Sequence, residues 1–123
     1  MKRILIAEDE PSIVLSLEFL LTEAGYEVFT AVNGADALKL AEQHKPDLLV
    51  LDIMLPVVNG FEVCRTVRST PAVRAMPILM LTARGREQEI AKGLALGANA
   101  YVTKPFATRE LMSKIRELLG ARE

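Results

Sequence analysis

Residues 48–60 read LLVLDIMLPVVNG, a short apolar run that ends on an acid and is followed by a loop. The first four residues are continuously apolar, which is typical of a strand buried on both faces of a parallel sheet. Asp52 is then expected at the carboxyl end of that strand, and Pro56 with Asn59 and Gly60 favours a turn after it. Open parallel sheets bind ligands just beyond these strand ends, so Asp52 is a candidate functional residue.

Four other short apolar runs are expected to be strands: residues 3–8 (RILIAE), 26–31 (YEVFTA), 77–83 (PILMLTA) and 100–103 (AYVT). The run 26–31 alternates polar and apolar residues, which favours an edge position. Between and after the runs, apolar residues recur at helical spacing and predict five helices. The alternation predicts an α/β fold, a three-layer doubly wound sandwich around a five-stranded parallel sheet.

Composition limits the classes of protein to which the chain can belong. Its 123 residues fit one domain over 1–123, and 50% hydrophobic content suffices for one core. A formal net charge of -1 argues against direct nucleic-acid binding, since neutralising phosphates requires a basic excess. The single cysteine, Cys64, excludes an internal disulfide and is expected to pack inside a helix.

The sequence also predicts a cytoplasmic location. No apolar span is long enough to cross a membrane, so we expect no membrane partner. The first residues, MKRILIAEDEP, are unlike a secretory signal because acids interrupt the apolar segment early.

Reactive side chains follow four of the five expected strands: Glu8 and Asp9, Asp52, Thr82, and Lys104. These ends share one edge of a parallel sheet, so the carboxylates would repel one another unless a cation joined them. Carboxylates, a backbone carbonyl and phosphate oxygens are the ligands typical of Mg²⁺. Asp52 could then attack phosphorus to form an aspartyl phosphate, with Lys104 and Thr82 binding the phosphoryl oxygens.

The motifs Glu8-Asp9, Asp52, Thr82-Ala83 and Lys104-Pro105-Phe106, with LDIMLP and NG between them, resemble the receiver domain of two-component response regulators, including the chemotaxis regulator. The resemblance spans essentially the whole chain. It implies a flavodoxin-like fold with strand order 2-1-3-4-5 and five helices.

The resemblance implies that Asp52 takes a phosphoryl group from a phosphohistidine on a sensor histidine kinase or a histidine phosphotransfer protein. Asp9, Asp52 and the backbone carbonyl of Met54 match the positions that bind Mg²⁺, for which Mn²⁺ can substitute. Glu8 matches a residue that acts through water. Such a domain is not an enzyme towards other substrates, because it catalyses only its own phosphorylation and dephosphorylation.

Thr82 and Tyr101 match the switch pair of that family. Phosphorylation is implied to draw the Thr82 hydroxyl towards the phosphoryl group and to turn Tyr101 inward. This changes the face formed by the fourth helix, fifth strand and fifth helix, to which a downstream protein or effector domain binds, or at which a phosphorylation-linked homodimer forms. Lys104-Pro105 is expected to be a cis bond. Met54 and Arg84 match positions that tune dephosphorylation.

Other readings of the same residues remain open. The chain could be a receiver-like interaction module regulated without phosphorylation. A phosphohydrolase with an aspartate nucleophile would need a second acid two residues after Asp52, where Met54 stands. The apolar pair Val57-Val58, where the family often has an acid or glycine, indicates either a partner contact or a loop packed against the body. Among the basic residues, Arg65, Arg68 and Arg74 are predicted to form a solvated patch, with a partner contact as the alternative. His44 is predicted to lie on the surface.

Overall fold

The computed structural model describes residues 1–83 and 85–120. Five strands and five helices alternate along these residues, as the sequence predicts. The strands are β1 (Arg3–Ala7), β2 (Glu27–Ala31), β3 (Leu48–Asp52), β4 (Ile78–Ala83) and β5 (Ala100–Lys104). The helices are α1 (Pro11–Glu23), α2 (Gly34–His44), α3 (Gly60–Ser69), α4 (Glu87–Ala95) and α5 (Thr108–Gly120).

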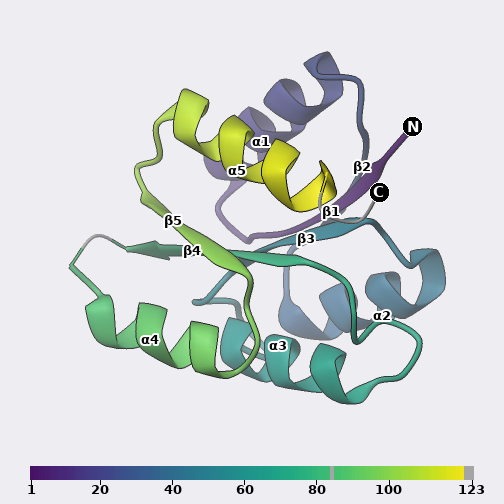
Figure 1. Cartoon of the computed structure of the whole chain (residues 1–123), viewed down its shortest axis with the longest axis vertical. Coiled ribbons are helices and arrows are strands. Elements are labelled where there is room, and N and C mark those ends of the chain that lie inside the picture. The colour runs from purple at the N-terminus through teal and green to yellow at the C-terminus, as the bar shows by residue number, and fades with distance from the viewer. Residues whose placement is uncertain (84, 121–123) are drawn as a thin grey trace.

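The strands form one parallel sheet in the order β2-β1-β3-β4-β5, which confirms the flavodoxin-like fold. β2 is an edge strand, as its alternating sequence predicts, and β5 is the other edge. Helices α1 and α5 cover one face of the sheet, and α2, α3 and α4 cover the other (Figure 1). Two faces are covered because parallel strands need crossover helices, and right-handed crossovers distribute these over both sides.

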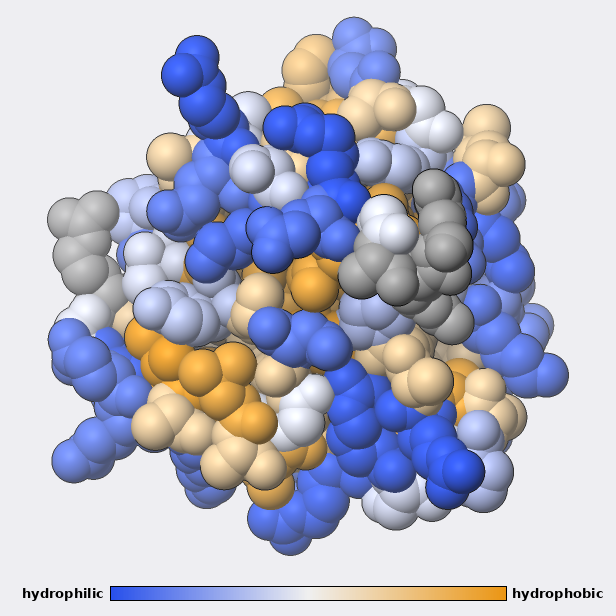
Figure 2. Space-filling model, viewed as in Figure 1, coloured by the Kyte–Doolittle hydropathy of each residue, from blue (hydrophilic) through white to orange (hydrophobic). Residues whose placement is uncertain are grey.

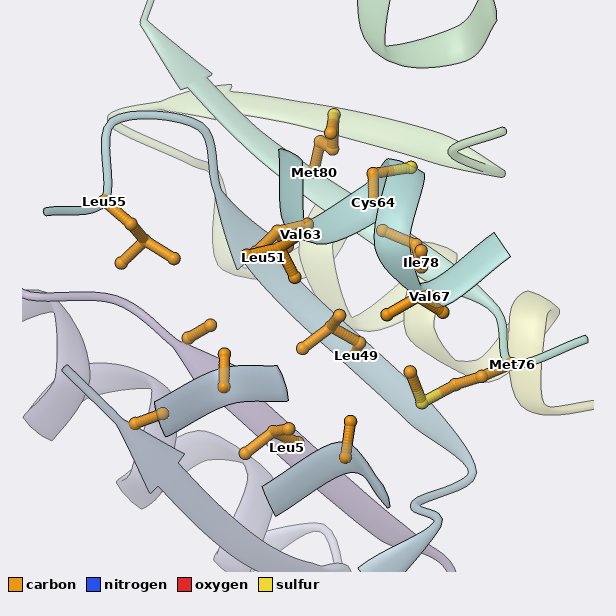
Figure 3. Close-up of a cluster of buried hydrophobic side chains, with 14 of the residues drawn as sticks. Leu5, Leu49, Leu51, Leu55, Val63, Cys64, Val67, Met76, Ile78 and Met80 are labelled. Carbon is orange, nitrogen blue, oxygen red and sulfur yellow. The ribbon is translucent and has the colours of Figure 1, made fainter. Parts of the chain in front are cut away.

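Each face of the sheet has its own hydrophobic core. Successive side chains of a strand point to opposite faces, so Leu49 and Leu51 pack towards α2 and α3, while Leu48 and Val50 pack towards α1 and α5. Figure 3 shows the core on the α3 side. All five residues of β3 are buried, which explains its unbroken apolar sequence and places Asp52 at the end of the central strand of the sheet.

Two asparagines start the helices that flank the carboxyl edge of the sheet. The Asn33 side chain accepts a hydrogen bond from the backbone N–H of Asp36 at 2.8 Å and caps α2. The Asn59 side chain accepts one from the N–H of Glu62 at 3.0 Å and caps α3. Such caps satisfy amide groups that the helix itself leaves unpaired, and they determine where each loop ends.

Gly93 inside α4 has a packing reason that the sequence alone does not reveal. It is buried, and a Cβ atom at this position would lie 2.4 Å from Met80 Sδ on β4. Glycine therefore lets α4 approach the sheet closely. The other end of α4 is weakly secured, because Arg86 at the N-cap makes no side-chain capping bond.

The predicted solvated arginine patch is wrong for Arg68. Its guanidinium donates to the carbonyl oxygens of Gly97 (3.0 Å), Arg74 (2.9 Å) and Met76 (2.7 Å), and to Asn99 Oδ1 at 2.9 Å. These groups belong to the two loops at the amino ends of β4 and β5. Main-chain carbonyls are the same in every residue type, so the sequence could not reveal that Arg68 binds them. We call this set of hydrogen bonds between Arg68 and the two loops the Arg68 clamp.

His44, predicted to be a surface residue, is half-buried. Its ring stacks on Phe29 with 4.2 Å between ring centroids and 14° between planes. This contact joins the end of α2 to β2. None of the helices in the described part of the chain is long and apolar enough to span a bilayer.

Candidate functional site

The carboxyl edge of the parallel sheet brings together the reactive side chains from the ends of four strands. Lys104 Nζ lies 2.8 Å from Glu8 Oε1 and 3.1 Å from Asp52 Oδ1. Thr82 pairs in register with Thr103, next to Lys104. The convergence expected from the strand ends is therefore present in the structure.

Burial makes these charges strongly dependent on one another. Glu8 is fully buried and Asp52 is 3% exposed, so each carboxylate has lost most of its hydration. Burial raises the pKa of Glu8, and the hydrogen bond from Lys104 only partly opposes that effect. Burial also disfavours the charged form of Lys104, but the hydrogen bond to Glu8 and the nearby Asp52 outweigh it and raise the pKa of the lysine.

Three acids at this edge could hold a metal ion. Glu8, Asp9 and Asp52 each offer a carboxylate oxygen, and these oxygens lie within 4.8 Å of one another. Glu8 and Asp52 are buried and Asp9 is exposed. One lysine cannot balance three carboxylates, so the donor set fits a hard divalent cation such as Mg²⁺.

The two oxygens of Asp52 have different surroundings. Oδ1 receives both the Lys104 ammonium group and a long hydrogen bond of 3.4 Å from the backbone N–H of Met54. Neither contact involves Oδ2. The following loop folds back tightly on the strand, since a Cβ atom at Gly60 would lie 2.4 Å from the Asp52 carbonyl oxygen. Glycine is required there, and the loop is held close to the acid.

Thr82 and Tyr101 lie beside each other around one hollow. Thr82 is 2% exposed, and among the described residues its hydroxyl donates only a long 3.5 Å hydrogen bond to the Ala83 carbonyl. Tyr101 is half-buried and shares with Thr82, Met80 and Ile90 the lining of a narrow hollow under α4. The predicted switch pair is therefore adjacent, and the Thr82 hydroxyl is weakly engaged.

The rim of the site is apolar. Met54 is 70% exposed and Val57 is 80% exposed, whereas Val58 is half-buried against the core. The prediction of a loop packed against the body is therefore confirmed for Val58, and a partner contact at Val57 stays a prediction. Val57 also has φ 71°, a left-handed conformation that costs a β-branched residue of the order of 1–2 kcal/mol. Sequence reasoning missed this strain, because residue type gives no signal for positive φ at valine.

The Lys104-Pro105 bond is cis, as the resemblance implies. Cys64 is buried among the α3 core residues. Metal binding by the Met54 carbonyl stays a prediction, and Arg84 lies outside the described residues.

Comparison of the sequence with protein families matches residues 4–116 to the response regulator receiver domain. Among relatives, the alkaline phosphatase synthesis transcriptional regulatory protein PhoP of Bacillus subtilis (strain 168) is 48% identical over 99% of this chain and 50% of its own length. The phosphate regulon transcriptional regulatory protein PhoB of Rhizobium meliloti (strain 1021) is 45% identical over 95% of this chain and 52% of its own length. The chain thus spans about half the length of these relatives.

Solved structures give the same result. The chemotaxis response regulator CheY4 of Vibrio cholerae has a TM-score of 0.90 at 34% identity, over 96% of this chain and 98% of that one. The receiver domain of sensor histidine kinase PA1611 from Pseudomonas aeruginosa PAO1, with a magnesium ion in its active site cleft, has a TM-score of 0.90 at 32% identity, over 97% and 98% of the two chains. Together with the acid cluster and the strand order, these matches establish that the chain belongs to the response regulator receiver domain family.

Proposed function

We propose that the chain is a phosphoryl-accepting switch of a two-component system, with Asp52 as the acceptor and a phosphohistidine as the donor. The observation that carries this proposal is the single Lys104 Nζ held 2.8 Å from Glu8 and 3.1 Å from Asp52 at a strand end. Family membership supports it. The arrangement leaves a buried nucleophilic carboxylate beside a cation that can receive phosphoryl oxygens.

The transfer exchanges one bond to phosphorus for another. An Asp52 oxygen attacks the phosphorus, a P–O bond forms, and the bond between phosphorus and the donor histidine nitrogen breaks, leaving its electron pair on that nitrogen. Oδ2 is the attacking atom, because Oδ1 is engaged by Lys104 and the Met54 N–H. Lys104 then binds one phosphoryl oxygen and the Thr82 hydroxyl donates to another.

Asp9, Asp52 and the Met54 carbonyl would hold Mg²⁺, with Glu8 acting through water and Mn²⁺ able to substitute. The spacing of the three acids supports this assignment, and so does the magnesium ion in the related receiver domain. When bound, the ion supplies positive charge for the transferred group. Glu8 and Asp9 would hold the ion close to Asp52.

Phosphorylation would change the face formed by α4, β5 and α5 through Thr82 and Tyr101. The partners are a sensor histidine kinase or histidine phosphotransfer protein upstream, and a downstream protein or effector domain, or a second copy of the chain. Relatives named as transcriptional regulators and as a histidine kinase support both contexts. The chain would act in the cytoplasm and catalyse only its own phosphorylation and dephosphorylation.

Intact-mass measurement after incubation with acetyl phosphate and Mg²⁺ tests the proposal. We expect one acid-stable, base-labile phosphoryl group on the wild-type protein and none on Asp52→Asn. Asp36→Asn, at an exposed position on α2, is the matched control and should gain the group normally. Absence of the addition from the wild type would favour the unphosphorylated interaction module instead, and equal addition to Asp52→Asn would contradict the assignment of Asp52 as the acceptor.

A further inference from the structure

Lys114 of α5 holds Tyr101 of β5 by two contacts at once. Its Nζ donates a 2.8 Å hydrogen bond to the Tyr101 carbonyl oxygen and lies 4.8 Å from the centroid of the Tyr101 ring. We propose that Lys114 is a latch that keeps Tyr101 at the edge of the sheet and so sets how readily the domain switches. This inference rests on the proposed function, in which Tyr101 is a moving part.

The latch reaches around the open edge of the sheet. The Tyr101 side chain packs against the core covered by α2 and α3, whereas Leu111 and Ile115, on either side of Lys114 in α5, belong to the core of the opposite face. β5 is an edge strand with no further strand beside it, so Lys114 supplies the donor that a neighbouring strand would otherwise give to the Tyr101 carbonyl. Figure 1 shows that α5 follows β5 and lies beside α1 on one face of the sheet.

Lys114 has no competing partner within the described residues. It forms no ion pair with a carboxylate there, so its charge is directed only to the tyrosine carbonyl and ring. A cation over an aromatic face is attracted by the negative potential of the ring. The position of the Tyr101 ring therefore depends on Lys114 more than on any anchor of its own, because the Tyr101 hydroxyl makes no hydrogen bond to the residues that the structure describes.

Inward movement of Tyr101 has to break this latch. The hollow between Tyr101 and Thr82 is too narrow to hold a water molecule, and Ile90 and Leu94 of α4 close it. The ring can enter only if it leaves the Lys114 cation and α4 gives way. Figure 2 shows apolar side chains gathered over α4 and hydrophilic ones over α5. Leu94 of α4 is 43% exposed. The contact of Lys114 with Tyr101 thus opposes the movement through which the phosphoryl site would change the α4 surface.

Fluorine NMR of the unphosphorylated protein labelled with 3-fluorotyrosine tests the latch. The chain has two tyrosines, and Tyr26→Phe assigns the Tyr101 signal. We compare Lys114→Met, which removes the charge and the donors, with Lys114→Arg, which keeps both. Lys39→Met, at an exposed position on α2, controls for the loss of one positive charge.

In Lys114→Met, the ratio of the population with the Tyr101 ring inward to the population with the ring outward should rise about threefold. This is the size expected for losing a partly exposed cation–π contact. The readouts are a shift of the Tyr101 signal towards its position in the phosphorylated protein and a matching loss of broadening by a soluble paramagnetic agent. Lys114→Arg and Lys39→Met should retain the wild-type signal. An unshifted Tyr101 signal in Lys114→Met, or an equal shift in Lys39→Met, overturns the latch.

Two further measurements keep the outcome unambiguous. An unchanged Tyr26 signal verifies that each variant is folded, and Lys114→Gln replaces Lys114→Met if that variant is not. Phosphoryl addition is followed separately by intact mass. If the wild type gains no phosphoryl group, the proposed function fails, while paramagnetic broadening of Tyr101 in the unphosphorylated variants still decides on the latch. If the wild type gains the group but Lys114→Met matches it in the Tyr101 signal, only the latch fails.

Discussion

The two ends of the sheet each hold a half-buried cation, in opposite chemical settings. At the carboxyl end, Lys104 pairs with the carboxylates of Glu8 and Asp52, and these contacts raise its pKa against the opposing effect of burial. At the amino end, Arg68 is bound mainly by neutral carbonyl oxygens, and burial lowers the pKa of its guanidinium. Lys104 is therefore paired with acidic groups, whereas Arg68 is bound by neutral, dipolar groups.

Because of this difference, added ions should affect the carboxyl end of the sheet and leave the amino end unchanged. Arg68 has a full set of neutral partners, so added ions have little to change there. The carboxyl end has three carboxylates and one lysine within reach, and its charge is incompletely balanced. An added cation or phosphoryl group therefore changes the interactions of every member of the cluster. The same sheet thus has a cation with neutral partners at its amino end and an incompletely balanced charge cluster at its carboxyl end.

The largest expected effect is the loss of the Arg68 clamp. Arg68→Met removes four hydrogen bonds from a charged donor and leaves partly buried carbonyls unpaired, so the free energy of unfolding should fall by about 3 kcal/mol. Urea denaturation measures it. Arg65→Met on the same helix is the control. Among the described residues the 58% exposed Arg65 side chain pairs only with Glu62, so its loss should cost below about 0.5 kcal/mol. Equal losses in the two variants would remove the distinction between clamp and surface.

Lys104→Met should come next, at about 2 kcal/mol, because it leaves the fully buried Glu8 without a counter-charge. The double variant with Glu8→Gln should recover part of that loss, since no buried carboxylate then remains at this position. Denaturant unfolding of both variants, without divalent cations, gives the comparison. A double variant less stable than Lys104→Met alone would show that Glu8 does not depend on Lys104 in this way.

Magnesium should raise the free energy of unfolding by binding at the carboxyl end of the sheet. At a Mg²⁺ concentration about ten times the dissociation constant, linkage predicts a gain of about 1.4 kcal/mol in the free energy of unfolding. Thermal melting should show this rise in the wild type and in Arg68→Met, whose substitution lies at the other end of the sheet. Asp9→Ala should lose it. A rise that persists in Asp9→Ala would place the ion elsewhere.

The smallest effect concerns pH, since burial and Lys104 act on Glu8 in opposite directions. Burial raises the pKa of Glu8 above 4.5, so the folded protein binds this proton at a higher pH than the unfolded chain does. This contribution to stability is complete below the unfolded value and is lost as the pH rises through the folded pKa. The free energy of unfolding of the wild type relative to Glu8→Gln should therefore decline from pH 4.5 to neutrality in a chelator. A constant difference between the two proteins would contradict the raised pKa.

Much of the fold could be predicted because burial is recorded in residue type along each strand. The unbroken apolar run of β3 predicted a central strand, and the alternation in residues 26–31 predicted the edge strand β2. The ends of elements were less certain: β1 ends at Ala7 and β5 extends to Lys104, each one residue from expectation. Strand ends depend on hydrogen bonds between segments, which local patterns do not contain.

The candidate site was predictable to the level of chemistry. Asp9, Asp52, Thr82 and Lys104 are the residue types that phosphoryl and metal chemistry require, and parallel topology brings strand ends to one edge. The unequal surroundings of the two Asp52 oxygens were not predictable. They arise because the end of β5 brings the Lys104 ammonium group, and the loop after β3 brings the Met54 N–H, to the same oxygen, Oδ1.

The sequence by itself determined the alternation of strands and helices, the order of the reactive residues, and the sign of the charges at the strand ends. These are properties of residue type and spacing. Tertiary structure alone decided that Arg68 clamps two loops, that Lys114 grips Tyr101 around the sheet edge, and that Val57 adopts a positive φ. Each depends on a main-chain atom or a ring placed by distant segments, and main-chain atoms are the same in every residue.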